Sequence, residues 1–262
     1  MQITAIRELI ETALHAAIKA GVGILDVYYS ADFGLEYKAD NSPLTLADKR
    51  AHEIIAECLN STNIPVLSEE GKSIAFAERN QWEMFWLVDP LDGTKEFVKR
   101  NDEFTVNIAL IKGNTPIGGV VYVPVTRSIY WAGEQGSFKA IVEDNNEVFS
   151  NIQRLPLTLS KENFVIAGSR SHMSPETVKY IQSLDTKEKP VEIKPKGSSL
   201  KICMVAEGYA DIYPRLGPTM EWDTAAGHAI VKFAGKNIYQ IENNEPLVYN
   251  KDSLLNPWFV VK

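Results

Sequence analysis

The spacing of apolar residues divides the chain into a helical beginning, a strand-rich middle and a mixed final part. Apolar residues recur at helical spacing over residues 3–25, which predicts a long first helix with one face on the core. Turn residues at 41–43 come before a second helix, which is expected to end near Leu59. We expect both helices to cover one face of a sheet.

The middle of the chain has the pattern of antiparallel strands. Apolar, β-branched and aromatic runs at 104–111, 116–125 and 128–132 are separated by short turns. These runs predict a meander, and residues 136–142 are expected to add a further strand. The polar residues 143–147 are expected to form a loop or a hairpin tip.

Beyond Leu155 the pattern changes to alternating strands and helices, which predicts an α/β arrangement. The expected strands are 164–168, a strand closing at Ile193, and 210–216, and the expected helices are 175–184, 200–207 and 221–235. We therefore expect two lobes, residues 1–154 and residues 155–262. Because no Gly/Ser linker separates them, they should pack together as one unit with a cleft between them.

Composition excludes several classes of protein. The chain has 262 residues of which 45% are hydrophobic, enough for a sizeable core. Its net charge of -7 argues against a general nucleic-acid or membrane-surface binder, since both partners are anionic. Two distant cysteines suit a reducing compartment, and no apolar run reaches the ~18 residues of a membrane span. We expect a cytoplasmic protein, with loose attachment to the inner membrane face left open.

The most distinctive chemistry lies at residues 86–97, where an apolar run meets two aspartates. Pro90 restricts Asp89 to extended conformations, and Gly93 permits a turn that other residues resist. Asp89 and Asp92 are therefore held close together, and their repulsion favours a cation between them. Hard carboxylate oxygens suit Mg²⁺. An ordinary acidic surface turn is the alternative.

Three further acids stand at the ends of elements. Glu69 follows the short apolar strand expected at 64–67, as Asp89 follows its own strand. Asp48 falls in the first turn of the second helix, and Asp223 at the start of the last one. At those two positions the helix dipole or N-capping is a sufficient explanation by itself.

Taken together, three motifs resemble the signature of the lithium-sensitive, magnesium-dependent phosphatases of the inositol monophosphatase superfamily. They are Ser-Glu69-Glu70, Asp89-Pro-Leu-Asp92-Gly-Thr94 and Trp222-Asp223-Thr-Ala-Ala-Gly227. The resemblance covers nearly the whole chain. It implies an α+β fold of the layered α/β/α/β/α sandwich type found in sugar phosphatases and inositol monophosphatases.

The resemblance also implies roles for individual residues. It assigns metal ligation to Glu69, Asp89, the backbone carbonyl of Leu91, Asp92 and Asp223. It places Asp48 and Thr94 at the attacking water, with two or more Mg²⁺ ions per site and inhibition by Li⁺. Attack on phosphorus would then be in line, without a covalent phosphoenzyme.

Within the superfamily, the segments 197–201, 213–215 and 169–172 are similar to the 3'(2'),5'-bisphosphate nucleotidases. This similarity implies a small nucleotide bisphosphate as substrate and no nucleic-acid polymer. Hydrolysis would remove the 3'-phosphate of adenosine 3',5'-bisphosphate, and of 3'-phosphoadenylyl sulfate as well. The implied substrate-binding residues are Glu69, Gly93, Thr94, His172, Ser198, Lys201, Arg215 and Asp223.

Three alternatives differ in class. Inositol monophosphatase or fructose-1,6-bisphosphatase activity is the nearest, and Lys201 and Arg215 favour a nucleotide over both. Haloacid-dehalogenase phosphatases place Asp-x-Asp-Gly-Thr after a strand, but here the two aspartates are one residue further apart, with Pro90 at the second position. A non-catalytic magnesium and nucleotide sensor is the last alternative.

Overall fold

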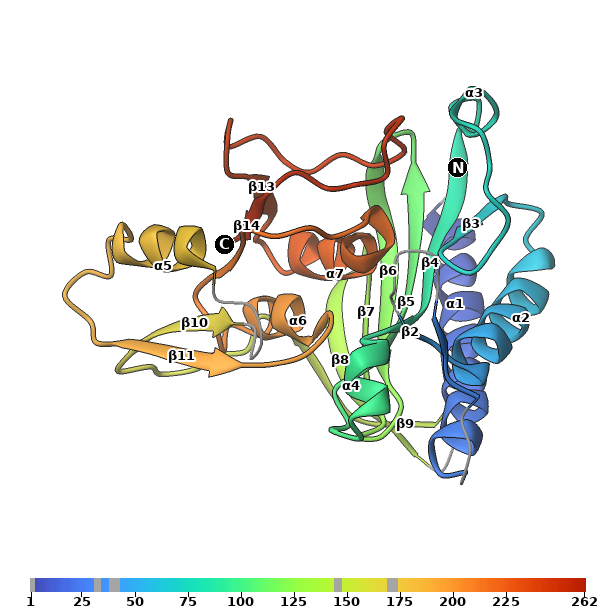
Figure 1. The fold of residues 1–262 in the computed structure, drawn as a ribbon, viewed down its shortest axis with the longest axis horizontal. Helices are drawn as coiled ribbons and strands as arrows, with labels where there is room; N and C mark the ends of the chain where they lie inside the picture. Colours follow the sequence, from blue (N-terminus) through green and yellow to red (C-terminus); the bar gives the residue numbers. More distant parts are fainter. Residues whose placement is uncertain (1–2, 31–33, 38–42, 144–147, 169–173) are drawn as a thin grey trace.

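The fold, seen in a computed structural model that describes residues 3–30, 34–37, 43–143, 148–168 and 174–262, is a stack of five layers (Figure 1). Two helices, α1 (Ile3–Tyr28) and α2 (Leu46–Asn60), form the first layer. They pack on one face of the large sheet, as expected. Ala13, Ala16 and Ala17 on α1 are fully buried, and their small side chains let the helix approach its neighbours closely.

The second layer is a seven-stranded sheet in the spatial order β3-β4-β5-β6-β7-β8-β9. Only β3 and β4 pair in parallel, and the remaining neighbours pair antiparallel, which confirms the predicted meander. The strands are β3 (Val66–Ser68), β4 (Met84–Asp92), β5 (Thr105–Lys112), β6 (Thr115–Val123), β7 (Ser128–Gly133), β8 (Gly136–Glu143) and β9 (Val148–Leu155).

Strand β9 was not among the predicted strands. It contains Ser150, Asn151, Gln153 and Arg154, and it lies at the edge of the sheet with most of its residues at least partly exposed. An edge strand buries little surface, so its sequence lacks the apolar signal of a central strand. The predicted hairpin tip falls largely on residues 144–147, which lie outside the described residues.

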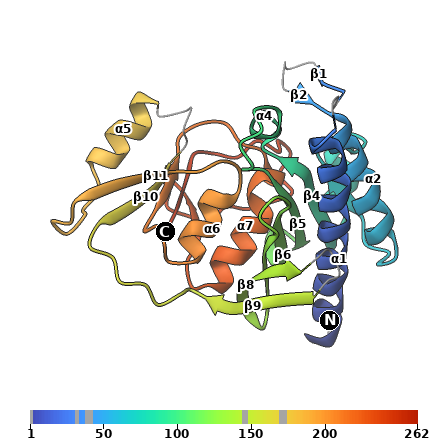
Figure 2. The same cartoon turned by 90° about the horizontal axis from the view of Figure 1, so that it is seen from below.

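Helices α6 (Leu200–Ala206) and α7 (Glu221–Phe233) form the third layer, on the opposite face of the sheet (Figure 2). Contact between α7 and β6 is close because small residues meet there. A Cβ atom on Gly119 would lie 2.8 Å from the carbonyl oxygen of Ala226. The sheet therefore fixes the position of α7, including its N-terminus.

The fourth layer consists of short strands and the fifth of one helix. An isolated parallel bridge between Ile166 and Ile212 connects the β10-β11 pair to the sheet β12-β14-β13. These strands are β10 (Phe164–Gly168), β11 (Val191–Pro195), β12 (Tyr213–Arg215), β13 (Ile238–Gln240) and β14 (Phe259–Val261). Helix α5 (Pro175–Gln182) packs on their outer face through Tyr180 and Ile181.

Four short elements complete the order: β1 (Glu36–Tyr37), β2 (Pro43–Leu44), α3 (Phe76–Arg79) and α4 (Thr94–Val98). The layered α/β/α/β/α architecture inferred from the resemblance is confirmed. One apolar core joins strands of the first half to α6 and α7 of the second, so the division near residue 154 stays a prediction. Among the described residues, no helix is long and apolar enough to cross a membrane.

A buried histidine on α7 makes the stability of the fold depend on pH. The Nδ1 atom of His228 lies 2.9 Å from the hydroxyl of Tyr249, and its Nε2 atom contacts Asn237. Burial lowers the pKa of His228 to about 4 from its usual 6.5. Between these two values the unfolded chain binds a proton that the folded chain does not, so stability falls as the pH falls.

We therefore predict that His228→Gln loses less stability than wild type between pH 7 and pH 5. The stability lost by the two proteins should differ by about 2 kcal/mol, because pH 5 lies roughly 1.5 units below the pKa of an unfolded histidine. Urea unfolding at both pH values measures it. An unchanged difference in His228→Gln would contradict the role of His228.

Candidate metal centre and active site

The acidic turn is a bulge within strand β4. Asp89 pairs with Asn107 and Asp92 pairs with Thr105, and the register shifts between the two pairs. The sequence predicted that the strand ends before this turn; instead, pairing resumes at Asp92. The bulge occurs at Pro90, which has no N–H to donate to the ladder.

Two local features hold the bulge in shape. The backbone N–H of Leu91 donates to Asp89 Oδ1 at 3.1 Å. Gly93 follows with φ +95, in the left-handed region that favours glycine. Because successive side chains of a strand point to opposite faces, Asp89 points to the same face of the sheet as Leu87, toward α7.

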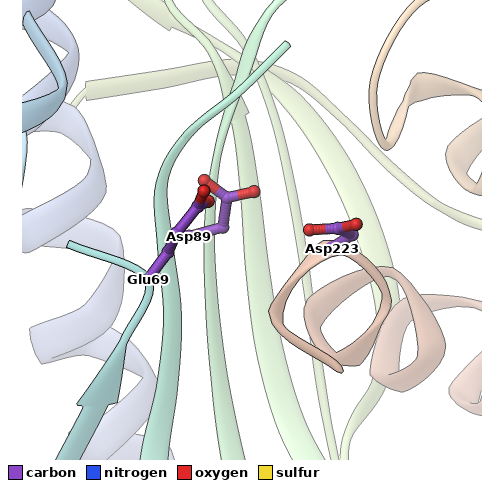
Figure 3. Close-up of side chains that lie close together, drawn as sticks. All are labelled: Glu69, Asp89 and Asp223. Atoms are coloured by element: carbon purple, nitrogen blue, oxygen red, sulfur yellow. The ribbon is translucent and has the colours of Figure 1, made fainter. Parts of the chain in front are cut away.

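Three carboxylates from separate elements meet on that face (Figure 3). Oxygen atoms of Glu69, Asp89 and Asp223 all lie within 4.8 Å of one another. Glu69 follows β3, Asp89 lies on β4, and Asp223 is in the first turn of α7. The structure thus brings together three of the predicted metal ligands, although Glu69 and Asp223 are 154 positions apart in the sequence.

Burial and mutual repulsion make this cluster costly without a cation. Burial raises the pKa of Asp89 well above its usual value, and the charges of Glu69 and Asp92 raise it further. Burial, followed by the charge of Asp92, raises the pKa of Asp223 to about 8. A divalent cation would favour the charged forms that burial disfavours. Oxygen donors of this kind fit Mg²⁺.

Asp223 also has a structural role. Its Oδ2 atom accepts a hydrogen bond of 2.8 Å from the backbone N–H of Met220, just before α7. Negative charge at this end of a helix is favoured by the helix dipole. The capping explanation and the cluster therefore apply to the same residue.

Asp92 lies beside the cluster and is held by polar side chains. Its Oδ2 atom accepts from Ser199 Oγ at 2.9 Å. Thr105 Oγ1 and Asn107 Nδ2 each lie 3.4 Å from the same oxygen, and Asn107 also donates to Ser199 Oγ at 2.9 Å. Metal ligation by Asp92 stays a prediction, and these contacts would fix its orientation.

Sequence reasoning missed Thr105, Asn107 and Ser199 as part of the site. A signal was present, because Thr105 and Asn107 are polar residues two apart on a strand that is otherwise apolar up to Ile111. Period-two alternation places both on the face of Ala109 and Ile111, toward α7. Both are fully buried, where an unpaired polar group is costly, so their partners are part of the site.

Asp48 and Thr94 are in contact, as the resemblance implies. Thr94 Oγ1 donates to Asp48 Oδ1 at 3.1 Å and lies 3.4 Å from the carbonyl oxygen of Leu91. The other oxygen of Asp48 accepts from the backbone N–H and the hydroxyl of Thr45, at 2.7 and 2.6 Å. Burial raises the pKa of Asp48, while the bonds from Thr45 lower it. The carboxylate of Asp48 thus caps helix α2 and also contacts Thr94.

A pocket of 440 Å³ opens next to the cluster and holds most of the predicted substrate residues. Gly93, Ser198, Lys201 and Arg215 line it, together with Asp92 and Asp223. His172 lies outside the described residues. The pocket is bounded by α4, by the segment before α6, and by β12.

Lys201 and Arg215 supply positive charge to this pocket. Lys201 is 7% exposed, and its ammonium donates to the carbonyl oxygens of Ser198 at 2.7 Å and Lys196 at 3.2 Å. Burial lowers its pKa to about 8. Arg215 donates through Nη2 to the carbonyl of Pro218 at 3.0 Å.

Two buried polar atoms at the pocket have no hydrogen-bond partner among the described residues. They are Ser198 Oγ and Arg215 Nε. Buried polar groups are rarely left unpaired, so a ligand with hydrogen-bond acceptors would satisfy both. A phosphate group has such acceptors, and Arg is well suited to bind it.

Comparison with known proteins identifies the family of this chain. The model of the inositol monophosphatase family matches residues 5–258. The chain belongs to the inositol monophosphatase family. It is 44% identical over 257 residues to the 3'(2'),5'-bisphosphate nucleotidase CysQ of Salmonella typhimurium, covering 97% of this chain and 99% of that protein. Identity to the protein of the same name from Escherichia coli K12 is 43%, with the same coverage.

Solved structures share the fold of this chain. CysQ from Bacteroides thetaiotaomicron superposes with a TM-score of 0.87 at 50% identity, covering 100% of this chain and 97% of that one. The extragenic suppressor protein suhB from Bartonella henselae has a TM-score of 0.73 at 24% identity, covering 97% and 93%. The resemblance drawn from the three motifs is thus confirmed at the level of the family.

We predict that Asp89→Asn stabilises the metal-free protein. The substitution keeps the Oδ1 acceptor for Leu91 and removes one buried like charge. The free energy of unfolding in a chelator should rise by about 1 kcal/mol, which corresponds to roughly 2–4 °C in Tm. Differential scanning calorimetry measures the change.

The same variant should lose the rise in Tm that Mg²⁺ gives to wild type, because binding to the folded state alone is stabilising. Asp102→Asn, an acid outside the cluster, is the control and should keep that rise. A lower Tm of Asp89→Asn in chelator, or a wild-type response to Mg²⁺, would contradict the metal site.

Proposed function

We propose that this protein is a magnesium-dependent phosphatase that hydrolyses the 3'-phosphate of adenosine 3',5'-bisphosphate, and also that of 3'-phosphoadenylyl sulfate. The observation that supports it is the position of the carboxylate cluster beside a pocket with two cationic side chains, Lys201 and Arg215. Relatives covering nearly the whole chain are named 3'(2'),5'-bisphosphate nucleotidase.

The metal would be held by acids and one carbonyl group. The proposed ligands are Glu69, Asp89, Asp92, Asp223 and the carbonyl oxygen of Leu91, for two or more Mg²⁺ ions. When bound, Mg²⁺ supplies Lewis acidity that makes water more acidic and offsets charge on phosphate oxygens. Thr105, Asn107 and Ser199 keep Asp92 oriented within this set.

Asp48 and Thr94 would position the attacking water. The Thr94 hydroxyl donates a hydrogen bond to Asp48, so the lone pairs of Thr94 Oγ1 are available to accept a hydrogen bond from water. Asp48 cannot turn away because Thr45 holds its second oxygen. A fixed Asp48 thus fixes the direction in which Thr94 accepts, which favours in-line attack on phosphorus.

The second phosphate of the substrate would be retained in the cationic pocket. Lys201 offers charge from a buried position, and Arg215 Nε and Ser198 Oγ offer donors that lack protein partners among the described residues. Charge-assisted bonds of this kind discriminate a bisphosphate from a monophosphate. Gly93, Glu69, Thr94 and Asp223 would contact the phosphate that is cleaved, and His172 the nucleotide.

We place this reaction in the cytoplasm, because the free cysteines Cys58 and Cys203 suit a reducing compartment. Li⁺ is proposed to inhibit it by competing at the carboxylate site. Neither statement affects the assignment of the substrate, which has its own test.

Phosphate release tests the proposed function directly. Purified protein should release phosphate from adenosine 3',5'-bisphosphate only with Mg²⁺, and with a higher kcat/KM than from inositol 1-phosphate or fructose 1,6-bisphosphate. Added Li⁺ should lower the rate. A higher kcat/KM for the inositol or sugar substrate would overturn the nucleotide specificity, and activity in chelator would overturn the metal requirement.

Arg215→Ala should weaken binding of the retained phosphate. We expect KM for adenosine 3',5'-bisphosphate to rise about tenfold, the effect of roughly one charge-assisted hydrogen bond, with less than twofold change for adenosine 3'-monophosphate. Steady-state kinetics on both substrates measures the split. Arg7→Ala, whose side chain is 63% exposed on α1, is the control. Equal increases of KM for both substrates would remove Arg215 from the retained-phosphate site.

A further inference from the structure

The segment of residues 196–199 joins β11 to α6 and lines the pocket beside the acidic turn of residues 89–93, which we call the metal loop. At its end, Ser199 contacts the proposed metal ligand Asp92. At its start, Lys196 and Gly197 contact Glu103, a residue of the first half between α4 and β5. This segment, which we call the 196–199 loop, is thus held at both ends.

Glu103 holds the loop with both carboxylate oxygens. Its Oε2 atom accepts from the backbone N–H of Gly197 at 2.8 Å, and its Oε1 atom accepts from Lys196 Nζ at 3.1 Å. The Glu103 side chain is 8% exposed, whereas that of Lys196 is 43% exposed. The buried bond to Gly197 should therefore contribute more than the half-exposed ion pair.

The main chain of Glu103 also sits between two glycines. A Cβ atom on Gly197 would lie 2.8 Å from the Glu103 carbonyl oxygen and 2.9 Å from the Glu103 Cβ. A Cβ atom on Gly93 would lie 3.2 Å from the same carbonyl oxygen and 3.3 Å from the Cβ of Ser198. Glu103 therefore touches both the metal loop and the 196–199 loop, and movement of either loop meets its backbone.

The loop in turn determines where Lys201 places its charge. The Lys201 ammonium is bound by the carbonyl oxygens of Lys196 and Ser198, on either side of the Gly197 that Glu103 holds. Ser198 has φ +43, a left-handed conformation that serine rarely adopts, so this geometry needs support from outside the loop. Glu103 gives that support through Gly197.

We propose that Glu103 is a positioning residue that sets substrate specificity, by holding the 196–199 loop so that Ser198 and Lys201 present their donors to the retained phosphate. Its side-chain hydrogen bonds to Lys196 and Gly197 act beside the Ser198 carbonyl that binds Lys201. We therefore expect its main effect on binding of the second phosphate. This inference rests on the proposed function.

Kinetics with two substrates tests the proposal. In Glu103→Ala, KM for adenosine 3',5'-bisphosphate should rise about tenfold, while KM for adenosine 3'-monophosphate and both kcat values change less than twofold. Glu103→Gln should recover most of the loss, because its amide oxygen can still accept from Gly197. A purely structural role would instead lower kcat for both substrates together.

Two further variants complete the test. Glu83→Gln, at a side chain 84% exposed, is the matched control and should equal wild type. Gly197→Ala pushes the loop away from Glu103 from the other side, and should reproduce the selective rise in KM; it replaces Glu103→Ala if that variant does not fold.

The outcomes separate this inference from the proposed function. If the wild-type protein does not prefer adenosine 3',5'-bisphosphate over adenosine 3'-monophosphate, both the inference and the proposed function are overturned. A normal wild-type preference that stays unchanged in Glu103→Ala and Gly197→Ala would overturn the inference alone, as would an equal rise in KM for both substrates.

Discussion

The repulsion among clustered carboxylates is the constraint on which this structure depends. Glu69, Asp89 and Asp223 lie within 4.8 Å of one another, in surroundings that raise the pKa of both aspartates. Such a cluster persists only because rigid elements hold each acid in place. The parallel strands β3 and β4 deliver two of them to one edge, and α7, pressed on Gly119 of β6, delivers the third. Repulsion in the cluster lowers the free energy of unfolding, and a cation bound there would raise it again.

Several polar residues contribute to structure and to the site at once. Asp48 accepts from the capping residue Thr45 with one oxygen and from Thr94 with the other. Asp223 accepts from Met220 at the start of α7 while its carboxylate joins the cluster. Helix capping and the proposed function are therefore compatible at both residues. A carboxylate fixed by a helix terminus has lost its side-chain freedom on folding, and this preorganises it for chemistry.

The proposed chemistry and the proposed recognition of the second phosphate involve different parts of the structure. The large sheet and the first turn of α7 position the acids, whereas the 196–199 loop and β12 position Lys201 and Arg215. The two regions meet at several points, among them Ser199 on Asp92, Glu103 on Gly197, and Gly93 beside Ser198.

Local sequence alone determined the two long helices, the meander and the acids at the ends of strands, because periodicity and turn chemistry act over a few residues. Motif resemblance added the family and the layered fold. Only the tertiary structure decided the edge strand β9, the bulge that lets β4 continue to Asp92, and the contacts of Asn107, Ser199 and Glu103. Those features depend on contacts between residues far apart, such as the bond from Asn107 to Ser199, which are 92 positions apart. A polar residue on a buried strand signals that it has a partner, but only packing decides which one.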